Sequence, residues 1–355
     1  GARARVRIAP PPVTMRDNSR LELGGVFHRL HGAGNREGID PANAMSSGGT
    51  KEMAMHFVAL AASLLFTSSL SMTVSDSVWH ARSGAYSPAE TSVGGKRTFS
   101  YGDDLKQRID FWPTSSARAV KGAPLVIFVH GGGWKRGDMS MMDGSAKLGH
   151  WHQQGYAVAS VNYRLVPDAT VEQQAADVAS AIAYLTRHAA NLGIDPTRIA
   201  PVGHSAGAHL VSLVGTDPAY LKAAGLSLGD VRAIVALDGA CYDVPAQLAS
   251  GPGIMQQTYL QAFGRDPVRQ RKLSPTFQAG APKAPEFLIL HVQRPDGARQ
   301  SEELAAALRK AGTKAAVQGF AGRGLRGHMQ INRQMGEEDY APTRAVDTFL
   351  ARIFA

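Results

Sequence analysis

A serine flanked by glycines occurs where an apolar run gives way to helical periodicity. The sequence GHSAG at 203–207 follows the strand-like segment 198–203 and opens a segment with helical spacing, 206–215. Glycines two residues before and after a serine allow the sharp turn that exposes a nucleophilic hydroxyl at the end of a strand. Ser205 is therefore a candidate nucleophile toward an acyl carbon, and the Ala206 N–H would face the same space. The alternative is a glycine-rich packing turn with an idle serine.

A second glycine-rich element directly follows another apolar run. The sequence HGGGW at 130–134 comes after PLVIFV at 124–129. Successive glycines expose backbone N–H groups, and such donors stabilise the oxyanion that develops when a nucleophile attacks an acyl carbon. Gly132 and Gly133, together with Ala206, are the candidate donors. A phosphate-binding loop is the alternative, but neither the Gly-Lys-Ser/Thr ending nor the helix that should follow it is present in the sequence.

These two motifs resemble those of a known family. HGGGW and GHSAG occur in this order about 70 residues apart, with NYRL at 162–165 between them, and they resemble the α/β-hydrolase esterases related to hormone-sensitive lipase. The segment 173–207 is more similar still to the bacterial carboxylesterase and feruloyl-esterase-like branch. The resemblance extends from about residue 97 to the C-terminus. It implies acylation of Ser205, hydrolysis of an ester and no cofactor.

The resemblance also implies a general base, in the chain order serine, acid, histidine. Beyond the helix expected after Ser205, histidine occurs at positions 291 and 328. His291 ends an apolar strand and is interpreted as a residue at the sheet edge. His328 follows the strand-like segment 315–320 through a flexible, glycine-rich connection that could bring an imidazole over Ser205. His328 is therefore expected to be the general base.

Two aspartates are candidates for the acid that orients this base. Asp296 lies after the predicted strand 286–291, where the family carries its acid, but the usual His-Gly-x-x-Asp is replaced by HVQRPD. The aspartate therefore comes one residue later and behind a proline. Asp238 follows the preceding strand, 231–237, where some enzymes of this fold place the acid. We expect Asp296 to be the acid, with Asp238 as the alternative.

The elements that must position these residues alternate along the chain, as expected for a mostly parallel central sheet with helices on both faces. Strands are predicted at 108–112, 124–129, 157–163, 198–203, 231–237, 286–291 and 315–320, and helices at 171–191, 206–215, 301–311 and 342–354. Ser301 is the expected N-cap of its helix. The segment 240–283, rich in glycine, proline and glutamine, is predicted to be a short cap excursion over the strand ends. The sequence thus predicts one domain of the α/β class, with an α/β-hydrolase fold, at 76–355.

Three side chains near the glycine-rich loop could line a substrate pocket. Trp134 ends the loop, and Met141 and Met142 follow it. Core packing is the alternative for the methionines, and a lid over the sheet edge for Trp134. His150 and His152 have the spacing of a metal pair on a strand, but no third ligand accompanies them. No metal site is therefore predicted, and a solvated helix surface is the preferred interpretation.

Composition limits the classes of protein that fit. Of the 355 residues, 44% are hydrophobic and 19% are charged, which suits a folded core and excludes a mainly disordered or multi-pass membrane chain. The formal net charge is +9, but the basic residues are scattered, so no nucleic-acid partner is expected. The single cysteine, Cys241, cannot form an intrachain disulfide and is expected to be a small buried hydrophobic residue.

The first 75 residues differ from this pattern. Residues 1–56 lack apolar periodicity and are interpreted as a disordered leader or a reading-frame artefact. The apolar run 57–66 precedes small polar residues, so 57–75 is predicted to be a secretory signal and its cleavage region. Export, without stable membrane insertion after processing, is then expected. A buried or membrane-resting helix is the alternative, and without a signal the protein would be cytoplasmic. The oligomeric state is not indicated by the sequence.

These observations together predict a serine carboxylesterase that acts on small soluble acyl or aryl esters through an acyl-serine intermediate. The predicted cap excursion is short for a lipase lid, which argues against emulsified fat as substrate. An arylformamidase-like amidase is the alternative among enzymes, because the same triad and oxyanion loop serve both reactions. A catalytically inactive binding protein of the hydrolase fold is the alternative outside the enzymes, although such proteins usually lack the histidine that His328 supplies.

Overall fold

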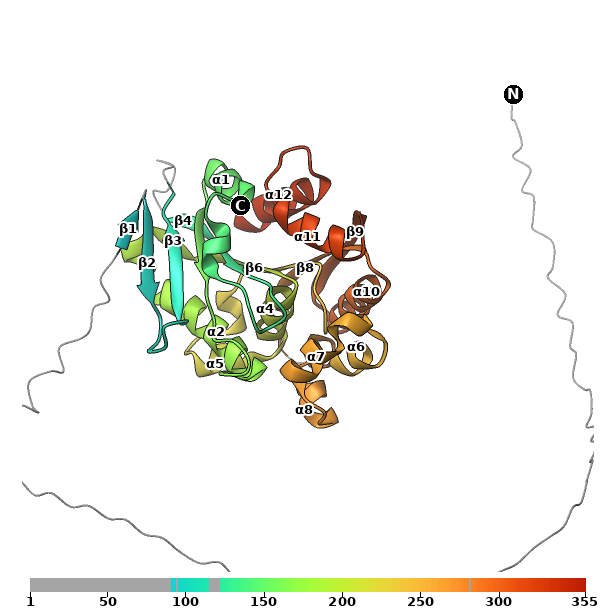
Figure 1. Ribbon diagram of the computed structural model, residues 1–355. Helices are drawn as coiled ribbons and strands as arrows, with labels where there is room; N and C mark the ends of the chain where they lie inside the picture. Colours follow the sequence, from blue (N-terminus) through green and yellow to red (C-terminus); the bar gives the residue numbers. More distant parts are fainter. Residues whose placement is uncertain (1–90, 94, 115–121, 281) are drawn as a thin grey trace, which may run out of the picture. The chain divides into compact units, whose positions relative to one another are not determined.

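A computed structural model describes residues 91–93, 95–114, 122–280 and 282–355 (Figure 1). The predicted leader at 1–56 and the predicted signal region at 57–75 lie outside these residues. None of the described helices is long and apolar enough to cross a membrane. The described strands are β1 (Thr91–Val93), β2 (Lys96–Ser100), β3 (Arg108–Trp112), β4 (Ala123–Val129), β5 (Ala157–Val161), β6 (Ile194–His204), β7 (Ile234–Leu237), β8 (Glu286–Gln293) and β9 (Lys314–Arg323).

The described strands form one sheet in the order β1-β2-β3-β5-β4-β6-β7-β8-β9. The first three pair antiparallel, β3 pairs antiparallel with β5, and all later neighbours are parallel. The predicted mostly parallel sheet is therefore confirmed. Val129 pairs with Gly203, and Leu237 pairs with both His204 and Leu290. Because parallel strands end at the same edge, the residues that follow β4, β6, β7 and β8 are brought together there.

Helices cover both faces of the sheet (Figure 1). One hydrophobic cluster joins the sheet to α2 (Val171–Arg187), α4 (Ala206–Thr216) and α10 (Pro295–Lys310), and a second joins it to α1 (Ala146–Gln153), α11 (Gly324–Arg333) and α12 (Ala341–Phe354). The sequence of β4 is apolar because both faces of this strand are buried. Ile127 lies in the first cluster and Phe128 in the second, because successive side chains of a strand point to opposite faces.

The segment 240–283, predicted to be an excursion, consists of short helices. They are α6 (Val244–Ser250), η3 (Gly253–Met255), α7 (Gln256–Phe263), α8 (Pro267–Lys272) and α9 (Pro275–Gln278). We call them the cap. The remaining short helices of the described chain are η1 (Met139–Met142), α3 (Ala189–Leu192), α5 (Pro218–Ala223) and η2 (Leu228–Asp230).

Two predicted boundaries around the site are wrong. The helix expected to begin at Ser301 begins six residues earlier, with Pro295 in its first turn, and Ser301 is fully buried inside it. Proline suits the first turn because the N–H that it lacks would have no helical partner there. The flexible connection expected before His328 is also absent, because β9 continues to Arg323 and α11 starts at the next residue. His328 is therefore carried by a helix.

A buried lysine links α1 to α11, the helix that carries His328. Lys147 is 3% exposed, and its Nζ donates a hydrogen bond to the Asn332 carbonyl at 3.1 Å. The same Nζ lies 5.1 Å from the centroid of the Phe128 ring. Burial lowers the pKa of Lys147 to about 8. The charged form of this side chain is thus disfavoured in the folded protein.

Replacing this lysine with methionine is expected to stabilise the fold at neutral pH. Lowering the pKa from 10.5 to about 8 corresponds to roughly 3 kcal/mol against the charged form, and losing the hydrogen bond removes about 1 kcal/mol of that gain. Lys147→Met should therefore raise the free energy of unfolding in urea by about 2 kcal/mol at pH 7.

The gain should depend on pH in a defined direction. Between pH 8 and 10.5 the unfolded wild-type chain binds more protons at Lys147 than the folded chain, so wild-type stability rises with pH. The advantage of Lys147→Met should therefore shrink over that window. Lys222→Met, at an exposed lysine of α5, is the control and should show neither effect. A Lys147→Met protein less stable than wild type at pH 7 would contradict the expectation.

Candidate active site

Ser205 occupies a strained turn between β6 and α4. Its backbone has φ 57° and ψ −119°, in a region that residues other than glycine rarely adopt. Gly207 then passes so close to β4 that an added Cβ would lie 2.1 Å from the Val129 carbonyl oxygen. The predicted turn is therefore present, and the side chain of Ser205 stands at the carboxyl edge of the sheet with part of its surface exposed.

His328 connects Ser205 to an aspartate. Its Nε2 lies 3.0 Å from Ser205 Oγ, and its Nδ1 lies 2.6 Å from Asp238 Oδ2. An ionised carboxylate can only accept, so Nδ1 carries the proton that is donated to Asp238. Nε2 is then left to accept a hydrogen bond from the Ser205 hydroxyl. The structure thus brings Ser205 and His328 together as the sequence analysis expects.

The aspartate in this chain is Asp238, and the expectation of Asp296 needs correction. Asp238 directly follows β7, is fully buried and has φ 45°. Its Oδ1 accepts a hydrogen bond from the Val292 N–H at 3.0 Å. Burial alone would raise the pKa of Asp238, but the hydrogen bond from His328 and the charge of Arg294 outweigh it and hold that pKa below its ordinary value. Asp238 therefore stays ionised.

Asp296 faces the cap instead. It lies in the first turn of α10, where its Oδ2 accepts a hydrogen bond from Gln247 Nε2 at 3.0 Å. Gln247 belongs to α6 and also donates to the hydroxyl of Tyr259 in α7 at 3.1 Å. Because α10 begins at Pro295, Asp296 lies in a helix, whereas the family carries its acid in a loop after this strand. Asp296 thus anchors cap helices and has no described contact with His328.

The glycine-rich loop lies beside Ser205. A Cβ added to Gly131 would lie 2.9 Å from Ser205 Cβ, so the loop and the serine are in direct contact. Gly132 has φ 129°, and a Cβ there would lie 2.0 Å from the Arg136 carbonyl oxygen. Within the described part of the chain, the N–H groups of Gly132, Gly133 and Ala206 donate to no other residue. The loop is therefore suited to donate hydrogen bonds to a substrate oxygen.

Two of the three predicted pocket residues are buried in the core and do not line an open pocket. Trp134 is 1% exposed, donates from Nε1 to His209 Nδ1 at 3.3 Å, and packs with its ring centroid 4.8 Å from that of Phe263 in the cap. Met142 is fully buried in the cluster that includes α1. Met141 is 46% exposed on η1, which contacts β3 and β5. The sequence could not separate these cases, since tryptophan and methionine serve both cores and pockets.

The cap reaches the site at the glycine-rich loop. A Cβ on Gly133 would lie 2.9 Å from Thr258 Cγ2 and 3.9 Å from Met255 Cε. Nothing in the sequence singled out Thr258 or Met255, because the contact joins segments about 120 residues apart that only the fold brings together. These two cap side chains therefore lie beside Gly133, one of the predicted oxyanion donors.

His204, at the variable position of the GHSAG motif, supports His328. Its Nε2 lies 2.9 Å from the His328 carbonyl oxygen, and the two rings are 4.6 Å apart. Burial lowers the pKa of His204 to about 3, so its imidazole is neutral and Nε2–H donates to that carbonyl. The position of His204 next to Ser205 was visible in the sequence, but no sequence pattern indicated this contact with His328.

The described residues include no cluster of three or more histidine, cysteine or acidic side chains that could hold a metal. His150, interpreted as part of a solvated surface, is only 7% exposed, and its Nε2 lies 2.8 Å from Asp347 Oδ2. It thus joins α1 to α12. Cys241 is fully buried, which confirms the expectation of a small core residue, and burial raises the pKa of its thiol well above the ordinary value.

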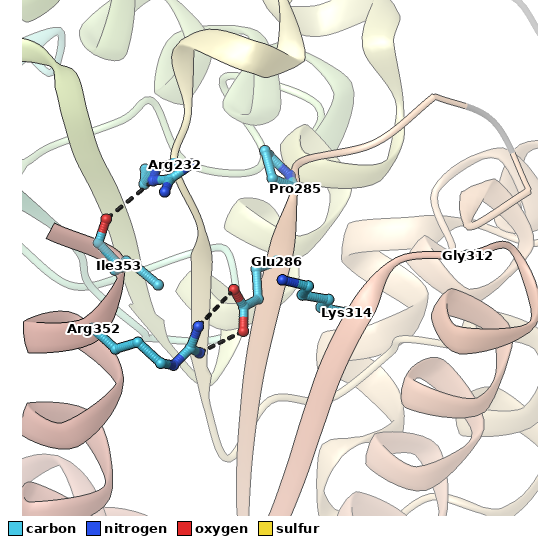
Figure 2. Close-up of a pocket in the computed structure, with 7 residues that line it drawn as sticks. All are labelled: Arg232, Pro285, Glu286, Gly312, Lys314, Arg352 and Ile353. Atoms are coloured by element: carbon cyan, nitrogen blue, oxygen red, sulfur yellow. Dashed lines mark hydrogen bonds and ion pairs between the residues drawn. The ribbon is translucent and has the colours of Figure 1, made fainter. Parts of the chain in front are cut away.

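A charged cavity of about 280 Å³ lies at the other end of the strands (Figure 2). Glu286 and Lys314, the first residues of β8 and β9, line it, whereas Ser205 and Asp238 follow the last residues of their strands. Figure 2 shows Arg352 paired with Glu286. Arg352 Nη2 donates to Glu286 Oε1 at 2.5 Å, and Nη1 donates to Oε2 at 3.1 Å. This cavity is therefore separate from the candidate active site.

A mostly parallel sheet with a strained serine behind a central strand and a histidine behind the last strand is the arrangement of the α/β-hydrolase fold. The chain has this fold. It matches the BD-FAE family model over residues 112–244. It resembles esterase B of Lactobacillus rhamnosis with a TM-score of 0.59 and 21% identity, over 75% of this chain and 87% of that one.

Curated relatives in Mycobacterium tuberculosis agree with this placement. The chain is 33% identical to esterase LipC over 210 residues, which cover 56% of this chain and 51% of LipC. It is 33% identical to carboxylesterase NlhH over 121 residues, 34% of this chain and 36% of NlhH. The chain thus spans about half or less of the length of these relatives. It has the α/β-hydrolase fold and is similar in sequence to these two esterases.

Proposed function

We propose that the protein hydrolyses carboxylic esters through an acyl-serine intermediate. The observation that carries the proposal is the continuous contact from Ser205 Oγ through the His328 imidazole to the buried Asp238 carboxylate, at 3.0 Å and 2.6 Å. A serine hydroxyl needs a base to become a nucleophile, and the base needs an oriented partner for its second nitrogen. The names of the related proteins, esterase LipC and carboxylesterase NlhH, support the same reaction.

Each residue has a distinct role in the proposed reaction. His328 Nε2 takes the Ser205 proton as the oxygen bonds to the acyl carbon, and Asp238 stabilises the imidazolium that forms. The N–H groups of Gly132, Gly133 and Ala206 stabilise the oxyanion. The imidazolium then donates its proton to the departing alcohol. Water, deprotonated by the same imidazole, attacks the acyl-serine. The imidazolium then returns the proton to the Ser205 oxygen as the bond to the acyl carbon breaks and the acid is released.

We infer small soluble acyl or aryl esters as substrates. The cap consists of short helices, of which the longest, α7, has eight residues. Met255 and Thr258 of the cap lie close to the oxyanion loop. Such a cap is short for a lipase lid, which argues against emulsified long-chain fat as substrate. We therefore expect short acyl groups to be processed faster than long ones.

The test is a series of p-nitrophenyl esters from acetate to decanoate, measured beside N-formylkynurenine and beside labelling by a fluorophosphonate probe. We expect turnover to be greatest for short acyl groups and the probe to modify Ser205. Hydrolysis of N-formylkynurenine with no ester turnover would replace the proposal with an amidase. A folded protein that shows no turnover and no adduct on Ser205 would overturn the enzymatic proposal.

A further inference from the structure

Arg294 contacts the carboxylate that holds His328. Its Nε lies 3.0 Å from Asp238 Oδ2 in an ion pair that lacks hydrogen-bond geometry, and the same oxygen accepts a hydrogen bond from His328 Nδ1. Its Nη2 donates to the Gly239 carbonyl at 2.9 Å, so the guanidinium spans the side chain of Asp238 and the backbone after it. The Arg294 side chain is 11% exposed and that of Asp238 is fully buried. The ion pair is thus largely shielded from water, where charges interact more strongly.

The fold provides a place for this guanidinium. Arg294 follows β8 and is the N-cap residue of α10. Strand β8 is the parallel neighbour of β7, which Asp238 directly follows. A Cβ added to Gly297 would lie 2.6 Å from Arg294 Nη2, so glycine leaves the room that the side chain occupies. In the HVQRPD sequence, arginine therefore lies next to the pair of Asp238 and His328, while the acid follows the preceding strand of the chain, β7.

Several other charged or titratable groups surround the pair of Asp238 and His328. They are the neutral His204 at the end of β6, Ser205 from the turn after it, Tyr242 after β7, Asp296 from α10, Lys147 from α1, and Tyr340 before α12. Of these, Asp296 lies 3.9 Å from Arg294 Nη1 and offsets part of its charge. Arg294 is the only cation in direct contact with Asp238 among the described residues.

We propose that Arg294 is a positioning residue that fixes the Asp238 carboxylate against His328 and, by its charge, keeps the imidazole unprotonated to lower pH. The inference rests on the proposed function. Both Arg294 and His328 contact the same carboxylate oxygen, so the guanidinium and an imidazolium would lie within about 6 Å of each other. Their repulsion opposes protonation of His328, which must be neutral to act as a base.

The test compares pH profiles of kcat/KM for p-nitrophenyl acetate. Arg294→Gln keeps hydrogen-bond donors but removes the charge, and we expect kcat/KM at its plateau to fall about tenfold and the acid limb to move up by about one pH unit. Arg294→Lys keeps the charge and should leave the acid limb where it is in the wild type. Arg299→Gln, at an exposed arginine of the same helix, is the matched control and should change neither quantity.

A second variant tests the charge argument in the opposite direction. Asp296→Asn leaves the charge of Arg294 uncompensated, so the acid limb should move down by a few tenths of a pH unit. The acid limb of Asp296→Asn therefore tests the charge effect of Arg294 even if Arg294→Gln does not fold. A purely structural role for Arg294 would lower kcat at every pH and leave both limbs in place, which would overturn the inference.

The outcome also separates this inference from the proposed function. If the wild type hydrolyses esters and takes the fluorophosphonate label but Arg294→Gln keeps the wild-type acid limb, only the role of Arg294 is wrong. If the wild type neither hydrolyses esters nor takes the label, the proposed function fails and the role of Arg294 fails with it.

Discussion

Ser205→Ala is expected to lower kcat for p-nitrophenyl acetate by about 10⁶-fold, because the acyl-enzyme can no longer form. His328 and the oxyanion loop remain in that variant, so the small residual rate comes from water attacking an ester held near the loop N–H groups. KM should change little, since the hydroxyl supplies the reacting atom and few ground-state contacts. The fold should also tolerate alanine, because the hydroxyl is bonded to His328 alone among the described residues.

Mass spectrometry after fluorophosphonate treatment provides the independent measurement. The wild type should gain one adduct on the peptide that contains Ser205, and Ser205→Ala should gain none. Ser140→Ala, at an exposed serine of η1, is the matched control and should keep both the adduct and the full rate. More than about a hundredth of the wild-type kcat in Ser205→Ala would point to another nucleophile and contradict the proposed mechanism.

The parts of the site predicted correctly depend on local sequence. A serine between glycines at the end of a strand, with a helix behind it, determines the turn at Ser205 almost alone. The glycine-rich loop at 130–134 is similarly local, since an apolar strand directly precedes it and glycine tolerates the φ of 129° at position 132. The sheet was predictable as well, because strands buried on both faces give apolar runs that are easily distinguished from helical periods.

Local sequence was not enough to identify the aspartate that contacts His328. Asp238 and Asp296 each follow a parallel strand, and neighbouring parallel strands end at the same edge, so both were compatible with contact to His328. The choice depends on how the chain leaves β8. Pro295 starts α10 at once and carries Asp296 toward Gln247, while Arg294 turns back onto Asp238. The departure from His-Gly-x-x-Asp was the one signal in the sequence that this strand end had changed.

The burial of the pocket candidates could not be predicted from the sequence either. Trp134 lies beneath the loop because Phe263, about 130 residues later, packs against it, and the same spacing would suit a tryptophan at the mouth of a pocket. The Ser301 prediction failed for a related reason. Serine followed by two glutamates is a good N-cap signal, but Pro295 starts the helix earlier, and Gly297, Gln300 and Ser301 are buried along it.

Asp238→Asn is expected to lower kcat by about 10⁴-fold, whereas Asp296→Asn should lower it by less than tenfold. Both changes replace a carboxylate near Arg294 with an amide of the same shape, so the pair is matched in size and in lost charge. Only Asp238 contacts His328, and without its charge the imidazole loses the partner that selects the Nδ1–H tautomer and stabilises the imidazolium.

The two variants need a stability control, because Asp238→Asn leaves the guanidinium of Arg294 without its buried partner. Thermal unfolding should therefore be measured first, and rates compared below the transition of the less stable variant. The fluorophosphonate reaction should slow in Asp238→Asn and stay near the wild-type rate in Asp296→Asn, since the probe needs the same activated hydroxyl as an ester. A 10⁴-fold loss in Asp296→Asn with a nearly unchanged Asp238→Asn would show that the sequence-based choice was right and that the contact to Asp238 is not the catalytic one.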